Sequence, residues 1–135
     1  MAGQEVKTKY DEFLRHLRGI QYIVINCCHG GFSLSKEACL MYLDLAGIDY
    51  TLKDQPDREQ QIKYGSMVVV EGYEFEGRDI DRNDPALVKV VRTLGDKANG
   101  KYARLKIVEV PAKVQWQIHD YDGREWVAEV HRTWS

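Results

Sequence analysis

The residues best suited to chemistry lie in one stretch where an apolar run ends and a helix is expected to begin. In order, they are Cys27, Cys28, His29, Gly30, Gly31, Phe32 and Ser33. Glycine has no side chain, so the backbone N–H groups of this stretch can approach a ligand closely. A helix that starts at Ser33 would add unpaired N–H donors and partial positive charge. We therefore predict that backbone amides from Cys28 to Ser33 hold a phosphate or carboxylate. The alternative is a plain glycine turn that joins a strand to a helix.

A second chemistry is open to Cys28, because a thiol at a helix N-terminus can have a lowered pKa and act as a nucleophile. The chain offers bases and orienting carboxylates for it, namely His29, His119, His131, Asp120 and Glu129. No local signature of a cysteine hydrolase surrounds Cys28. We therefore favour binding over catalysis, and a small hydrolase that uses Cys28 remains the alternative.

Aromatic and arginine residues elsewhere in the chain would complete a nucleotide site, since rings stack on bases and guanidinium groups bind phosphates. We predict that Arg78 or Arg132 neutralises the phosphate charge. Phe32, Tyr73 or Trp134 would stack on a base. The resulting expectation is a small-molecule nucleotide ligand, held in a preorganised pocket that a lid or a homo-oligomer interface closes.

Composition limits the other classes of partner. The 135 residues carry 19 basic and 21 acidic side chains, and the net charge of −2 argues against polymeric nucleic acid and anionic membranes. No apolar run approaches a membrane span, and the N-terminus lacks the apolar core of a signal peptide. Three cysteines fit free thiols in a reducing compartment, so we expect the cytoplasm. Cys27, Cys28 and His29 are contiguous with no second ligand pair, so neither a metal nor another cofactor is expected.

The elements that would position these residues predict one α+β domain over residues 1–135, with a mostly antiparallel sheet, a C-terminal β-meander and about three helices. Helices are expected over 5–18, over 34–46 and after the cap Asp84-Pro85. Strands are expected at 22–27, 49–52, 67–70, 73–76, 105–110, 114–118 and 126–130. Residues 53–65 are polar and aperiodic, which predicts a mobile loop or lid. Cys39 is assigned to the core, and Trp116 and Trp126 are assigned to it as cross-strand partners.

Several runs of the sequence resemble a widespread family of small phage and large-virus proteins. They are INCCHGGFSLS (25–35), DPALV (84–88), LGDKANG (94–100), LKIVEVP (105–111), YDG (121–123) and HRTW (131–134). Within the first run, Cys27 stands where the family has a threonine-like residue and His29 where it has an aromatic one. A mechanism with His29 as a family-wide base is therefore disfavoured.

The resemblance implies a virus-encoded accessory protein of the host cytoplasm. Small phage proteins of this sort often counter host defence, and one class sequesters the cyclic nucleotide signals of CBASS or Thoeris immunity without cleaving them. The function expected from the resemblance is therefore a sponge for a cyclic dinucleotide or a related signal. A protein-binding inhibitor of a host factor, acting through its aromatic surface and the 53–65 segment, is a further alternative.

Overall fold

The structure is a computed structural model and describes residues 19–130 of the chain. The helix expected over 5–18 lies outside these residues, as do the candidate site residues Arg132 and Trp134 and the candidate base His131.

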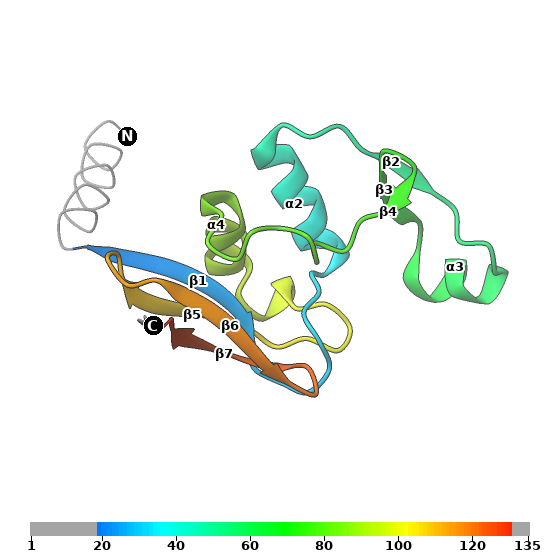
Figure 1. Cartoon of the computed structure of the whole chain (residues 1–135). Coiled ribbons are helices and arrows are strands. Elements are labelled where there is room, and N and C mark those ends of the chain that lie inside the picture. The colour runs from blue at the N-terminus through cyan, green and yellow to red at the C-terminus, as the bar shows by residue number, and fades with distance from the viewer. Residues whose placement is uncertain (1–18, 131–135) are drawn as a thin grey trace.

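Helices and small antiparallel sheets make up the described part of the chain (Figure 1). The strands are β1 (Ile20–Asn26), β2 (Thr51–Lys53), β3 (Met67–Val70), β4 (Tyr73–Glu74), β5 (Leu105–Pro111), β6 (Trp116–Tyr121) and β7 (Arg124–Glu129). The helices are α2 (Lys36–Ala46), α3 (Arg58–Tyr64), α4 (Pro85–Leu94) and the 3-10 helix Gly95–Ala98. The strands pair as β1–β5, β2–β3–β4 and β6–β7. The α+β class is confirmed, and in the C-terminal part β5 pairs with β1 while β6 and β7 form a hairpin.

Strand β1 lies at the centre of the fold because both of its faces are apolar. Consecutive side chains of a strand point to opposite faces. On one face Val24 joins the main core, which α2 and α4 complete. On the other face Ile23 and Ile25 pack with Val110 against hairpin β6–β7. The β1–β5 pair is therefore a middle layer between helices and a hairpin.

The helix ends follow the capping residues. Gly47 ends α2 in the left-handed conformation, and the Asp84 side chain accepts a hydrogen bond from the Ala86 N–H at the start of α4 (2.8 Å). Both had been predicted from the sequence. The cap of α2, however, is Ser35, whose Oγ accepts from the Ala38 N–H (3.1 Å). The expected start at Ser33 is wrong by two residues, so the amides of residues 28–33 are not free donors of the first helical turn.

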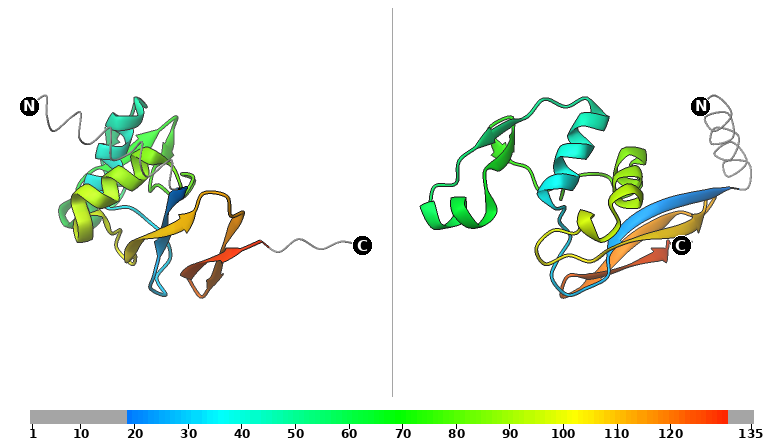
Figure 2. Two further views of the ribbon diagram at one scale, coloured as in Figure 1. Left: turned by 90° about the vertical axis from the view of Figure 1, so that its left-hand side faces the viewer. Right: turned by 180° about the vertical axis from the view of Figure 1, so that it is seen from behind.

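Residues 51–74, which we call the arm, extend away from the β1–β5 sheet (Figure 1 and Figure 2). The prediction of an aperiodic loop over 53–65 is wrong, because α3 lies within it. This helix begins at Asp57, whose side chain accepts from the Glu59 N–H (2.9 Å). None of its residues is buried, so it has no apolar stripe that a periodicity search could detect. Val68 of β3 is buried in the main core and anchors the arm to the body.

The two tight hairpins have the backbone expected of them. Glu71 and Gly72, and likewise Asp122 and Gly123, have positive φ values, as a two-residue turn of the primed type requires.

None of the helices in the described part of the chain combines the length and apolar composition that a bilayer crossing requires.

The register of β6–β7 corrects the assignment of the two tryptophans. Trp116 lies opposite Glu129, and Trp126 lies opposite His119, so the two indole rings are on opposite faces of the hairpin. Trp116 packs on the Ile23 side of β1, where its Nε1–H donates to Gln21 Oε1 (3.0 Å). Trp126 remains 46% exposed and is available to a ligand.

Candidate functional site

The loop that follows β1 is held in place by the fully buried side chain of Asn26. Its Nδ2 group donates to the carbonyl oxygens of Cys28 and Gly123 (both 2.8 Å), and its Oδ1 accepts from the Arg104 N–H (2.8 Å). The Asn26 N–H donates to Glu125 Oε1 (2.7 Å). One amide thus joins the loop, the β6–β7 turn and the start of β5, and all of its polar atoms are satisfied.

Close packing of the backbone accounts for two of the glycines near this loop. A Cβ atom on Gly30 would lie 1.8 Å from the Tyr102 carbonyl oxygen. A Cβ atom on Gly123 would lie 2.7 Å from the Gly31 nitrogen. The loop therefore fits between Tyr102 and the β6–β7 turn only because side chains are absent. This is the geometry of the glycine turn that the sequence left as the alternative to a phosphate cradle.

The thiols of Cys28 and Cys39 have structural partners. Cys28 Sγ donates to the Tyr102 carbonyl (3.0 Å) and to Asn26 Oδ1 (3.3 Å). Neither partner is a base that could take a proton, so these contacts position the Cys28 side chain and do not activate it as a nucleophile. Cys39 is buried, as predicted, and burial with the nearby charges of Glu76 and Glu74 raises its thiol pKa to about 12.

On one side of the loop lies a small hollow of about 280 Å³, which we call the Phe32 pocket. It is lined by Gly30, Gly31, Phe32, Arg78, Arg82, Asp120, Gly123 and Glu125. Four of the residues predicted for the site, Gly30, Gly31, Phe32 and Arg78, therefore do come together.

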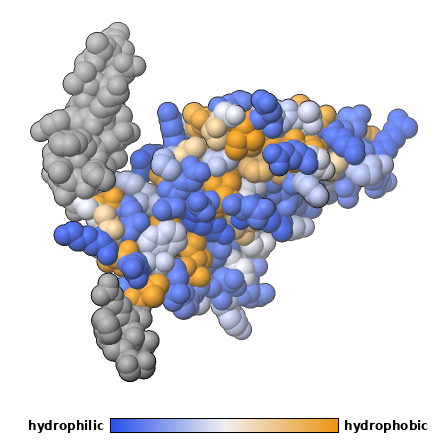
Figure 3. Space-filling view, turned by 45° about the horizontal axis from the view of Figure 1, so that its top comes forward, coloured by the Kyte–Doolittle hydropathy of each residue, from blue (hydrophilic) through white to orange (hydrophobic). Residues whose placement is uncertain are grey.

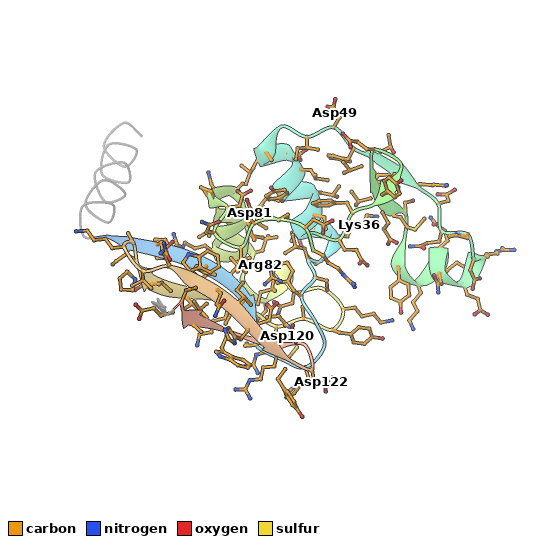
Figure 4. The ribbon with its side chains drawn as sticks, viewed as in Figure 1. Lys36, Asp49, Asp81, Arg82, Asp120 and Asp122 are labelled. Carbon is orange, nitrogen blue, oxygen red and sulfur yellow. The ribbon has the colours of Figure 1, made fainter. Side chains whose placement is uncertain are left out.

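Both arginines of the Phe32 pocket form ion pairs with glutamates of the same chain. Arg82 forms a two-pronged ion pair with Glu125 (2.6 and 2.9 Å), and the two side chains are only 17% and 11% exposed. The same guanidinium lies 3.5 Å from the centroid of the Phe32 ring. Arg78 pairs with Glu76 (3.0 Å). A base cannot use the ring face that Arg82 covers, and little positive charge remains for a phosphate. Figure 4 shows where Arg82, Asp120 and Asp122 lie.

A larger hollow of about 620 Å³ is lined by other residues of the loop and by residues of β5 and β7. We call it the His29 groove. It is lined by Ile25, Cys27, His29, Lys106, Val108, Tyr121, Arg124, Glu125, Trp126 and Val127.

Aromatic rings gather along the His29 groove. Tyr121 is 73% exposed, and the His29 ring meets it edge to face with the centroids 6.5 Å apart. Further along β7, Trp126 contacts His119 with ring centroids 5.7 Å apart. Exposed aromatic rings offer π-faces on which a planar ligand can stack.

Two cations of the His29 groove have no ion-pair partner among the described residues. Neither Lys106 nor Arg124 forms an ion pair with another described residue, since the ion pairs found in residues 19–130 are those of Arg78 and Arg82. Among the described lining residues Glu125 has the only carboxylate, and Arg82 neutralises it. The groove therefore presents net positive charge beside its rings, which suits an anionic aromatic ligand.

The other predicted site residues within 19–130 do not line the groove. The Ser33 carbonyl accepts from the Gly100 N–H (3.0 Å), so this residue joins the loop to the segment after α4. Tyr73 is 80% exposed but lies on β4 of the arm, away from the loop (Figure 1). Of the eight predicted residues that fall within 19–130, His29 alone lines the groove.

Comparison with protein-family models, curated proteins and solved structures found no match to this chain. Its function must therefore be inferred from the geometry of the site. Within residues 19–130, no group of three or more His, Cys, Asp and Glu side chains is placed to hold a metal ion.

Proposed function

We propose that this chain binds a nucleotide in the His29 groove and releases it unchanged. The observation that carries the proposal is that exposed rings line the same groove as two cations that form no ion pair within residues 19–130. Its volume of about 620 Å³ lies within the range of small-molecule sites, roughly 300 to 1,000 Å³. Tyr121 and Trp126 would stack on bases, and Lys106 and Arg124 would meet phosphates.

The arrangement favours a ligand with two bases and two phosphates. His29 and Tyr121 form one aromatic group at the turn end of the hairpin, and Trp126 provides a second ring further along β7. The two cations come from different strands, β5 and β7. A cyclic dinucleotide has this duplication of rings and charges. We extend the proposal to the role that the sequence resemblance implies, sequestration of a cyclic nucleotide immune signal by a viral anti-defence protein.

Binding without cleavage is favoured over the hydrolase alternative by the surroundings of Cys28. Its thiol donates to a carbonyl and an amide oxygen, and no histidine of the described residues is hydrogen-bonded to it. A nucleophilic cysteine is commonly activated by a base within hydrogen-bond reach, and residues 19–130 place none there.

The open shape of the groove leads to a proposal about assembly. Tyr121 and Trp126 are exposed, so a ligand stacked on them would keep one side in water. Tight capture requires most of the ligand surface to be buried. We propose that a second copy of the chain covers the groove, and light scattering with and without ligand would measure the change in mass.

A thermal-shift screen against cyclic dinucleotides, cyclic ADP-ribose isomers and mononucleotides tests the proposal. A ligand present at 100 times its dissociation constant stabilises the folded state by about 2.7 kcal/mol. Heat release and chromatography should then return the ligand intact. A converted product, lost in Cys28→Ala, would establish the enzyme alternative, and the absence of any shift would exclude nucleotide capture.

A second candidate function, binding to a protein partner, is favoured by the apolar side chains that the arm exposes. Ile62 of α3 is 77% exposed, and Leu52 and Tyr73 are also exposed. Figure 3 shows that hydrophobic surface gathers nearer the body, while the tip of the arm is mostly hydrophilic. Aromatic and aliphatic anchors of this kind occur at the centres of interfaces. If this candidate is right, Ile62→Ser should abolish recovery of a protein partner and leave nucleotide binding unchanged.

A further inference from the structure

Three lysines from separate elements gather around Tyr64, at the C-terminal end of α3. Lys101 Nζ donates to the Tyr64 hydroxyl (2.7 Å) and lies 4.8 Å from the centroid of that ring and 5.1 Å from the centroid of the Tyr102 ring. Lys63 Nζ lies 5.2 Å from the Tyr64 centroid. Lys36 Nζ lies beside Gly65, 3.4 Å from the point where a Cβ atom would stand. Figure 4 shows Lys36 at the base of α2.

No carboxylate of the described residues compensates this charge. The ion pairs of residues 19–130 are those of Arg78 and Arg82, so Lys36, Lys63 and Lys101 form none with this part of the chain. The chain as a whole carries a net charge of −2. A local concentration of three positive charges on an acidic protein is therefore a specific feature of this surface.

The electrostatics favour an anion at this position. Ammonium groups held near one another repel, and a bound anion relieves that repulsion. The hydrogen bond from Lys101, together with the nearby Lys63, lowers the pKa of Tyr64, which is a further sign of the positive field. Lysine acts toward phosphates as a mobile point charge with several donors, so three lysines can meet successive phosphate groups.

We propose that Lys36, Lys63 and Lys101 form a binding site for the phosphate chain of an oligophosphate, with the rings of Tyr64 and Tyr102 beside it. None of these residues lines the His29 groove. The site is therefore independent of the proposed function, and either can fail without the other.

The test is an NMR titration of the full chain with inorganic triphosphate at low salt, in which the chemical shifts of the backbone amides are measured. The largest shifts should fall on residues 63–65 and 101–102, and binding should weaken as salt rises. Lys101→Gln should reduce affinity about five-fold, and the change of all three lysines to Gln should abolish saturable binding. Lys89→Gln, which removes the same charge from the exposed face of α4, should leave affinity unchanged.

Two further measurements, one on the variant Tyr64→Phe and one with ATP as ligand, separate the contribution of the lysine charges from that of the tyrosine side chains. Tyr64→Phe removes the hydroxyl that receives the Lys101 hydrogen bond but keeps the three charges, so triphosphate affinity should be retained. ATP should bind more tightly than inorganic triphosphate if the tyrosine rings contribute stacking, and equally if charge alone acts. The proposal would be overturned if the chemical-shift changes were confined to other residues, or if neither anion showed saturable binding. It would also be overturned if Lys101→Gln and Lys89→Gln lost equal amounts of triphosphate affinity.

Discussion

Two hollows are lined in part by residues of the loop 27–32, and they differ in whether their cations form ion pairs. In the Phe32 pocket, Arg82 and Arg78 are held by Glu125 and Glu76, and Arg82 also covers the Phe32 ring. In the His29 groove, Lys106 and Arg124 have no ion pair with a described residue. The two hollows share one residue, Glu125.

The difference shows that the presence of arginine and aromatic residues beside a glycine loop does not by itself make an anion site. The Arg82 guanidinium covers the Phe32 ring and pairs with Glu125 of β7. These contacts attach the hairpin β6–β7 to the rest of the fold. Arg82 also neutralises Glu125, so this carboxylate does not offset the positive charges of Lys106 and Arg124 in the groove. The ion pair of the Phe32 pocket thus has a structural role, and the proposed ligand site is the other hollow.

The largest effect is expected from breaking the buried ion pair. Arg82→Gln leaves Glu125 charged and largely buried, which should lower the free energy of unfolding by about 3 to 5 kcal/mol. Urea denaturation measures the loss. Arg78→Gln is the matched control, since its pair with Glu76 is 67% and 45% exposed and should contribute less than about 1 kcal/mol. Equal losses in the two variants would contradict the structural role of Arg82.

A smaller effect is expected at Gly30, where the packing and phosphate-cradle interpretations differ. The added Cβ atom of Gly30→Ala would collide with the Tyr102 carbonyl, and we expect a loss of about 2 to 3 kcal/mol in stability. In Gly47→Ala the new atom meets nothing within 4 Å, and the left-handed backbone alone costs about 1 kcal/mol. A Gly30→Ala protein of normal stability that has lost nucleotide binding would instead support the cradle.

A third effect, which builds up gradually with pH, is a loss of stability under alkaline conditions that acts through the main core and not through either hollow. Burial raises the pKa of Cys39 from 9.0 to about 12, and burial with the hydrogen bond to Asp84 raises that of Tyr42 from 10.0 to about 12. The folded state then holds these protons more tightly than the unfolded state does. Stability should be full below pH 9 and should fall as pH rises toward 12.

Each of these two groups contributes up to about 1.4 kcal/mol per pH unit between its unfolded and folded pKa. Urea midpoints measured from pH 8 to pH 11 give the slope, and Cys39→Ala should flatten it below pH 10 whatever its effect on absolute stability. An unchanged urea midpoint over this pH range would show that folding does not raise the pKa values of Cys39 and Tyr42.

Local chemistry made part of this fold predictable. The caps Asp84 and Gly47 and the turn Asp122-Gly123 act through hydrogen bonds and φ preferences that a few neighbouring residues determine. Helix α3 was missed because a short helix without a buried face leaves no periodic signal. The tryptophan pairing was wrong although a signal existed, since a two-residue turn at Asp122-Gly123 places Trp126 opposite His119.

The candidate site was harder to predict than the fold, because it depends on contacts between distant segments. Lys106 and Trp126 reach the same groove only through the packing of β5 and β7 beside the loop. Nor does the sequence show that Arg82 is paired and Lys106 is not. Arg82 is separated from Glu125 by 43 positions. The sequence supplied the types of residue that the site needs, and the tertiary fold determines which of them are available.

The central claim, that a nucleotide uses the unpaired cations of the groove, is tested most directly by calorimetric titration of two variants. The ligand is the nucleotide that gives the largest thermal shift. Lys106→Gln should weaken its binding about ten-fold, the equivalent of about 1.4 kcal/mol. Arg78→Gln removes the same charge from the Phe32 pocket and should leave affinity within about two-fold. The reverse order, or no nucleotide binding by the unmodified chain, would contradict the claim.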